Sequence, residues 1–108
     1  MKGGGHTANP GFSSTEGVHI TMTRFKDVVY NANSGTADIG TGLVGDAVYE
    51  ALEPYNVSVL GGRVRDVGIA GFTLGGGYSF KTNQHGLAVD AVLGFELVLP
   101  NGTVNMVV

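Results

Sequence analysis

Apolar and polar residues alternate in three stretches of the first 42 residues, and such alternation is typical of strands with one buried face. These stretches are residues 18–23, 26–33 and 36–42. The second and third stretches flank Ser34-Gly35, a pair that predicts the turn of a β-hairpin. We therefore expect three strands here, two of them paired.

The last part of the chain predicts a second hairpin. In the stretch 92–99, apolar residues dominate both faces of the predicted strand. Asn101-Gly102 separates this stretch from the terminal run 103–108. An Asn-Gly pair between two apolar runs is the strongest short-range hairpin signal. A further short apolar run, residues 57–62, also predicts a strand.

Residues 43–55 predict a helix. Their apolar residues recur at spacings of three and four, and Pro54 marks the end of the pattern. The apolar set consists of Leu43, Val44, Ala47, Val48, Ala51 and Leu52.

Glycine dominates two further segments. Residues 3–17 are rich in turn-forming residues and predict a loop. In residues 61–80, seven of twenty positions are glycine, which argues against a helix because each interior glycine costs roughly 1 kcal/mol relative to alanine. The same segment carries many apolar side chains, so we expect its backbone to approach a partner closely.

Taken together, the 108 residues predict one α+β domain, with a mostly antiparallel sheet flanked by helices. A net charge of −3 and scattered basic residues argue against a nucleic-acid partner. Cysteine is absent, so a disulfide or thiolate metal site is excluded, and we expect no metal site. No apolar run is long enough to span a membrane, so we expect no membrane partner, and nothing indicates a compartment.

The two glycine clusters are candidates for an anion site, because glycine exposes backbone N–H groups without side-chain bulk. Neither contains the GxxxxGK[ST] or GxGxxG pattern, so a P-loop and a Rossmann fold are not indicated. His6 follows the first cluster directly. A histidine in a flexible tail is the alternative interpretation, and for His19 and His85 a surface position is expected.

Three motifs resemble one family. The loop "KGGGHTANPGFSS" resembles the R/K-G-G-G-H loop of the berberine-bridge-enzyme-like FAD-linked oxidases, in the vanillyl-alcohol oxidase superfamily. The segment "GGRVRDVGIAGFTLGGGYSF" resembles that family's second glycine-rich segment, and "GLAVDAVLGFELVLPNGTV" resembles its following strand pair. The three motifs occur in the family's order and cover essentially the whole chain.

The resemblance implies part of a PCMH-type FAD-binding domain, which holds an extended FAD between two subdomains. The loop Gly3–Thr7 would wrap the pyrophosphate, and His6 would bond covalently to the dimethylbenzene edge of the flavin. Val92 would lie near the adenine end. The full set of cofactor-binding residues implied is Gly3, Gly4, Gly5, His6, Thr7, Gly11, Thr41, Gly42, Gly68, Gly71, Gly75, Gly76, Gly77, Tyr78 and Val92.

Two positions refine the implied chemistry. Val64 stands where many members carry a second flavin-linking cysteine, so only the histidyl link is implied. Val67 stands where members carry a residue that gates oxygen, and valine is similar to the oxygen-reactive type. The resemblance therefore implies an oxidase that acts on a sugar or a secondary metabolite with oxygen as acceptor.

Family members are several times longer than this chain, with an FAD subdomain before this region and a substrate domain after it. We therefore expect a fragment, inactive alone, whose small-molecule substrate contacts lie in other domains, and we assign no catalytic residue. Two alternatives stay open. One is a non-catalytic FAD-binding relic or structural module, and the other is an unrelated α+β domain with glycine-rich loops.

Overall fold

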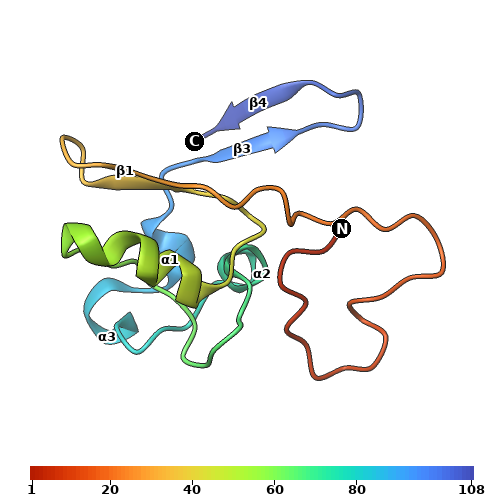
Figure 1. Ribbon diagram of the computed structural model, residues 1–108, viewed down its shortest axis with the longest axis horizontal. Coiled ribbons are helices and arrows are strands. Elements are labelled where there is room, and N and C mark those ends of the chain that lie inside the picture. The colour runs from red at the N-terminus through yellow and green to blue at the C-terminus, as the bar shows by residue number, and fades with distance from the viewer.

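The computed structural model describes residues 1–108 and contains short helices and two β-hairpins (Figure 1). The chain is therefore an α+β protein, as the sequence predicts. In order, its elements are β1 (Val28–Asn31), β2 (Thr36–Ile39), α1 (Gly45–Leu52), the 3-10 helix η1 (Glu53–Tyr55), α2 (Ile69–Leu74), α3 (Thr82–His85), the 3-10 helix η2 (Ala88–Ala91), β3 (Phe95–Val98) and β4 (Val104–Val107).

Both predicted hairpins are confirmed. β1 pairs with β2 in antiparallel register, and β3 pairs with β4 in the same manner. Gly35 and Gly102 close the two turns with φ values of 67° and 83°. Glycine adopts this left-handed backbone without the steric cost that a Cβ brings, which explains why the two turns fall where they do.

The expected helix is also confirmed, slightly shorter than predicted. α1 covers Gly45–Leu52 and continues into η1, which contains Pro54 and ends at Tyr55. Its apolar face carries Val48 and Leu52, which are 0% and 1% exposed. α1 packs beneath β1, so the centre of the small core lies between this helix and the first hairpin (Figure 1).

Two predicted strands are wrong. Residues 18–23 form only an isolated parallel bridge between Lys2 and Thr21, and residues 57–62 belong to no strand. The predicted single sheet is instead two separate two-stranded sheets. Alternation of apolar and polar residues indicates an extended segment with one buried face. A strand also needs a neighbouring strand to pair with its N–H and C=O groups, and neither of these two segments has one.

The expectation that residues 61–80 exclude a helix is also wrong, because α2 lies within them. The glycines mostly stand at its ends: Gly68 precedes the first turn and Gly75 follows the last. Only Gly71 lies inside the helix, so the loss of stability caused by an interior glycine applies once. Burial of the Ile69 side chain, which is 8% exposed, offsets this loss.

The predicted N-terminal loop is confirmed, since residues 3–17 contain neither helix nor strand. In Figure 1 it forms the long red and orange excursion on the side of the molecule nearest α2. No helix reaches the length and apolar character that crossing a bilayer requires. No three His, Asp or Glu side chains gather closely enough to ligate a metal ion.

Candidate functional site

A backbone bridge fixes Gly68 at the start of α2. The Gly45 N–H donates to the carbonyl of Val67 at 3.0 Å, and the Ile69 N–H donates to the carbonyl of Leu43 at 2.9 Å. These two hydrogen bonds join the starts of α1 and α2 on either side of Gly68. Gly68 is also buried. Because the two hydrogen bonds join the starts of two helices around it, its position is fixed by both helices.

The N-terminal glycine loop rests directly on this bridge. A Cβ added to Gly4 would lie 2.6 Å from the Gly68 Cα, and one added to Gly68 would lie 2.5 Å from the Gly4 N. A Cβ on Gly3 would lie 3.0 Å from the carbonyl oxygen of Thr41. Real Cβ atoms do not approach backbone as closely as the two Gly4–Gly68 distances, so the two glycine segments meet backbone to backbone.

A cavity of about 420 Å³ opens where the two segments meet. It brings together seven of the residues predicted to bind the cofactor, five from the first glycine segment and two from the second. These seven are Gly3, Gly4, Gly5, His6, Thr7, Gly68 and Gly71.

Four consecutive residues that line the cavity have unpaired backbone donors. The N–H groups of Gly3, Gly4, Gly5 and His6 donate to no acceptor within the protein. Gly5 has a φ of 79°, and the next turn is closed by a hydrogen bond from the Thr7 N–H to the Gly5 carbonyl at 3.0 Å. Successive N–H groups without an acceptor in such a turn can donate hydrogen bonds to a bound anion.

Six other residues line the cavity. Val67 is one of them, and the sequence had already indicated it as the position that gates oxygen. The other five were not predicted: Met1, Lys2, Phe12, Ser13 and Phe72. Of these, Lys2 could have been found, because it is the first letter of the motif that points to this loop. Lys2 and His6 are the cavity's only ionisable side chains, and no carboxylate lines it.

Three predicted residues lie near this cavity but do not line it. Thr41 faces Gly3 through its carbonyl, and Gly11 lies exposed at the far end of the loop with a φ of 82°. Gly42 packs against the carbonyl of Met22, and its N–H donates to the Phe25 carbonyl at 2.9 Å. In this structure Gly42 therefore allows two backbone segments to pass closely.

The remaining predicted residues follow the C-terminal end of α2 in the chain. The carbonyls of Gly76 and Gly77 accept hydrogen bonds from Val89 and Ala88 at 3.0 and 2.9 Å. Gly75, Gly76 and Gly77 thus join α2 to η2, and Val92 follows directly after η2. Tyr78 is exposed, with the Arg63 guanidinium carbon 5.0 Å from its ring centre.

The loop between α1 and α2 is tied back to α1 by Asp46. Its carboxylate accepts a hydrogen bond from the Asp66 N–H at 3.4 Å and lies 3.5 Å from Arg65 Nε. Asp66 has a φ of 62°. Burial raises the pKa of the neighbouring Tyr49 above its ordinary value, and the charge of Asp46 adds to the shift. These contacts hold the residues that lead into Gly68.

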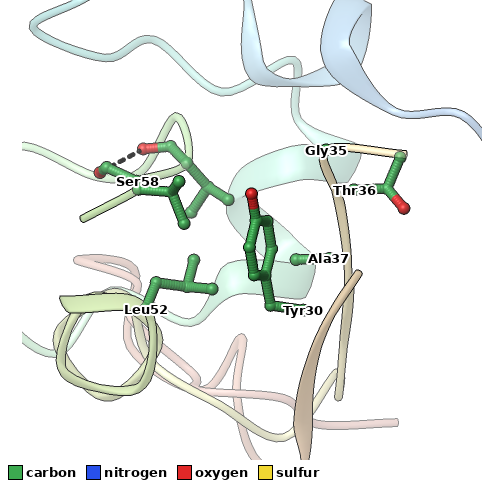
Figure 2. A pocket seen from close by; sticks show the side chains of 8 residues that line it. Tyr30, Gly35, Thr36, Ala37, Leu52 and Ser58 are labelled. Carbon is green, nitrogen blue, oxygen red and sulfur yellow. Dashed lines mark hydrogen bonds between the residues drawn. The ribbon is translucent and has the colours of Figure 1, made fainter. Parts of the chain in front are cut away.

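A second, smaller cavity of about 210 Å³ lies between the first hairpin and the end of α1. Figure 2 shows the Tyr30 side chain standing inside it, with Leu52 and Ser58 on one side and Thr36 and Ala37 on the other. It contains none of the predicted cofactor-binding residues. The two cavities are thus separate features of the fold.

Comparison with known proteins identifies the family of the chain. The profile of a family described as "FAD binding domain" matches residues 1–107. The FAD-dependent monooxygenase macF of Penicillium terrestre is 45% identical over 108 residues, a match that covers 96% of this chain and 21% of that protein. The FAD-dependent monooxygenase yanF of Aspergillus niger is also 45% identical and is covered over 18% of its length. The chain spans about a fifth of the length of such curated relatives.

Solved structures show the same fold. BBE-like 1 of Physcomitrella patens superimposes with a TM-score of 0.75 at 39% identity, over 80% of this chain and 19% of that one. The glucooligosaccharide oxidase of Acremonium strictum superimposes with a TM-score of 0.70 at 34% identity, over 79% and 18% of the two chains. That oxidase is described as carrying a 6-S-cysteinyl, 8α-N1-histidyl FAD. Because the family profile matches residues 1–107 and the similar folds cover about four fifths of the chain, this chain belongs to the FAD binding domain family.

Proposed function

We propose that this chain is the FAD-binding portion of a flavin-dependent oxidase and that the cavity between its glycine segments holds the diphosphate of FAD. The contact between Gly4 and Gly68 carries the proposal, because it joins the two segments around one cavity. If the segments faced apart, a single diphosphate could not touch both of them.

The residues present fit a diphosphate. Four consecutive N–H groups, from Gly3 to His6, have no acceptor in the protein, and three of these residues have no side chain to obstruct an approaching phosphate. Diphosphate oxygens need several donors in a small space, and backbone N–H groups supply them. Gly68 and Gly71 would support the phosphate from the opposite wall.

We further propose that His6 forms the covalent link to FAD. Its side chain is exposed at the cavity, immediately after the glycine run. A neutral imidazole nitrogen is a suitable nucleophile for the methyl carbon at the dimethylbenzene edge of the flavin. The absence of cysteine excludes the second, cysteinyl link described for the Acremonium strictum oxidase. One histidyl bond is therefore the proposed attachment.

Bound FAD would supply the redox chemistry, which is the acceptance of a hydride equivalent from the substrate. The proposed task of this chain is to bind the cofactor, fix its orientation and prevent its loss. In the whole protein, the substrate would be a sugar or a secondary metabolite bound by a further domain, with oxygen as the acceptor. Val67, which lines the cavity, is the residue proposed to admit oxygen.

The other predicted contacts remain predictions within this proposal. Thr41, Gly42 and Gly11 would flank the diphosphate loop. Gly75, Gly76, Gly77 and Tyr78 would reach the cofactor from the far side of α2, and Val92 would lie near the adenine. An upstream FAD subdomain and a downstream substrate domain would complete the cleft.

Acid denaturation tests the covalent proposal. The 108-residue chain is expressed alone and in place of the matching segment of the Penicillium terrestre monooxygenase, and the acid-precipitated protein is examined for flavin absorbance. We expect acid-stable flavin in the chimera, its loss in His6→Ala, and its retention in the control His85→Ala. A wild-type chimera that binds FAD but releases it in acid contradicts the covalent link. Bound FAD without turnover of any substrate would favour the non-catalytic alternative.

A further inference from the structure

Two segments of the chain match the N-x-[ST] pattern of an asparagine that carries an N-linked glycan. They are Asn56-Val57-Ser58 and Asn101-Gly102-Thr103, and neither lines the cavity proposed for FAD. The pattern fixes only two positions, so a match by itself carries little weight. Because such glycans are attached to surface loops, the structure around each asparagine distinguishes the two matches.

Asn101 lies in the turn that joins β3 to β4. Asn101, Gly102 and Thr103 are all exposed. The Gly102 N–H donates to the Leu99 carbonyl at 2.8 Å, and the Leu99 N–H donates to the Thr103 carbonyl at 2.8 Å, so the turn is closed by its own backbone. In Figure 1 this turn projects from the molecule, apart from the helices. A glycan attached here would extend into solvent without displacing a packed side chain.

The side chain of Asn101 forms an Asx turn with the residue that completes the motif. Its Oδ1 accepts a hydrogen bond from the Thr103 N–H at 3.0 Å. The Asn101 Nδ2 and the Thr103 hydroxyl take part in no hydrogen bond within the protein. A hydrogen bond donated to Oδ1 polarises the carboxamide, and its N–H groups become more acidic as a result. The turn therefore leaves the reacting nitrogen accessible and eases the loss of its proton.

The motif at Asn56 lacks this arrangement. Asn56 follows η1 with a φ of 54°, and its N–H donates to the Glu53 carbonyl at 2.9 Å. The Ser58 hydroxyl donates to the Val59 carbonyl at 3.3 Å, and no hydrogen bond joins Asn56 to Ser58. Val57 and Ser58 also line the second cavity. The hydroxyl that the pattern requires is thus already engaged, in a segment that lies against the core.

We propose that Asn101 is an attachment site for an N-linked glycan and that Asn56 is not. The donor is an oligosaccharide carried on a polyprenyl diphosphate, presented by the glycosyltransferase of the secretory pathway. Nδ2 of Asn101 forms a bond to C1 of the first sugar, and the bond from C1 to the diphosphate oxygen breaks. The polyprenyl diphosphate leaves, and Nδ2 gives up one proton. The inference is independent of the proposed FAD site, because the motif lies outside that cavity.

The test uses the 108-residue chain between a cleavable secretion leader and a carrier protein that lacks the N-x-[ST] pattern, expressed in yeast. Removal of the leader shows that the chain has entered the secretory pathway. Electrophoresis before and after treatment with peptide N-glycosidase detects the glycan, and mass spectrometry of the peptides locates it. We expect one glycan, attached to Asn101.

Four variants separate the reacting nitrogen from the shape of the turn. Asn101→Asp keeps an oxygen that accepts the Thr103 N–H but has no carboxamide nitrogen, so the glycan should be lost while the turn is retained. Thr103→Ala should also lose the glycan, and Thr103→Ser should retain it because serine keeps the hydroxyl. The matched control Asn56→Asp should leave the glycan in place.

A chain that has lost its leader and carries no glycan overturns the proposal. A glycan on Asn56, alone or together with one on Asn101, contradicts the distinction that the Asx turn makes between the two motifs. A glycan that persists in Asn101→Asp assigns the modification to another residue and overturns the role of Asn101.

Discussion

Gly4 and Gly68 are in backbone contact, although 63 positions separate them in the chain and each belongs to a different glycine segment. Neither residue has a φ in the left-handed region, so the requirement for glycine here is one of space and not of backbone conformation. The contact closes one wall of the proposed FAD cavity.

Gly68→Ala should therefore destabilise the chain by about 1–3 kcal/mol, because the added methyl group must displace the backbone of Gly4. Urea unfolding followed by circular dichroism measures the change. The control Gly17→Ala meets only the Thr15 hydroxyl at 3.6 Å and should be nearly neutral. Equal stability of Gly68→Ala and wild type would mean that the two segments are not in contact in solution.

Tyr49 should make the chain less stable at alkaline pH. Burial, with a smaller contribution from Asp46, holds the pKa of its phenol above the ordinary value of 10.0. The folded state thus retains the Tyr49 proton after the unfolded state has lost it. The stability linked to Tyr49 is fully present below pH 10.0 and is lost as the pH rises through the higher folded-state pKa.

The measurement is the urea midpoint of wild type and Tyr49→Phe as the pH is raised from about 8 to about 11. Tyr49→Phe should lose part of the alkaline decline, and Tyr55→Phe, which changes an exposed ring, should retain it. Parallel curves for wild type and Tyr49→Phe would rule out the linkage.

Leu52→Ala should largely unfold the isolated chain. Only nine of the 108 residues are buried, so we expect an unfolding free energy near or below about 5 kcal/mol. Removing a buried leucine side chain typically costs about 2–5 kcal/mol. Leu74→Ala, at a position that is 74% exposed, is the control and should change stability little. A cooperative Leu52→Ala melt close to wild type would contradict this view of the core.

The hairpin of β3 and β4 should drive self-association of the isolated chain. Val98 and Met106 are 62% and 68% exposed, and beyond their own pairing these strands make few contacts with other elements. Met106→Lys should reduce association without opening the hairpin, because the new charge faces Glu96 on the paired strand. Sedimentation velocity over a range of concentrations measures the effect. The control Asn83→Lys adds the same charge on α3, and an equal reduction there would assign the effect to net charge instead.

Local signals predicted the elements that depend on local chemistry. Both hairpins follow from turns that end in Gly35 and Gly102, and α1 follows from apolar spacing that ends at Pro54. The strands at 18–23 and 57–62 failed because pairing is a property of two segments, and alternation in one segment cannot supply a partner. α2 was missed because glycine content was counted over the whole segment and not by position within it.

The same distinction applies to the candidate site, where the sequence predicted some of the residues and not others. The motif order placed Gly3–Thr7 with Gly68 and Gly71, and the structure brings these residues around one cavity. Lys2 was not predicted to line the site, although it is the first residue of the loop motif; in the structure its side chain crosses Gly5. Gly42 illustrates the reverse: its close approach to Met22 gives it a packing role that no motif distinguishes from ligand contact.

The most direct test follows backbone amide signals while the labelled chain is titrated with FAD. If one diphosphate is held between the two glycine segments, the amides of Gly3, Gly4 and Gly5 should shift together with those of Gly68 and Gly71, at a single apparent dissociation constant. Gly35 and Gly102, in the two hairpin turns, should stay in place. Shifts confined to one of the two segments would show that the segments do not share a cofactor.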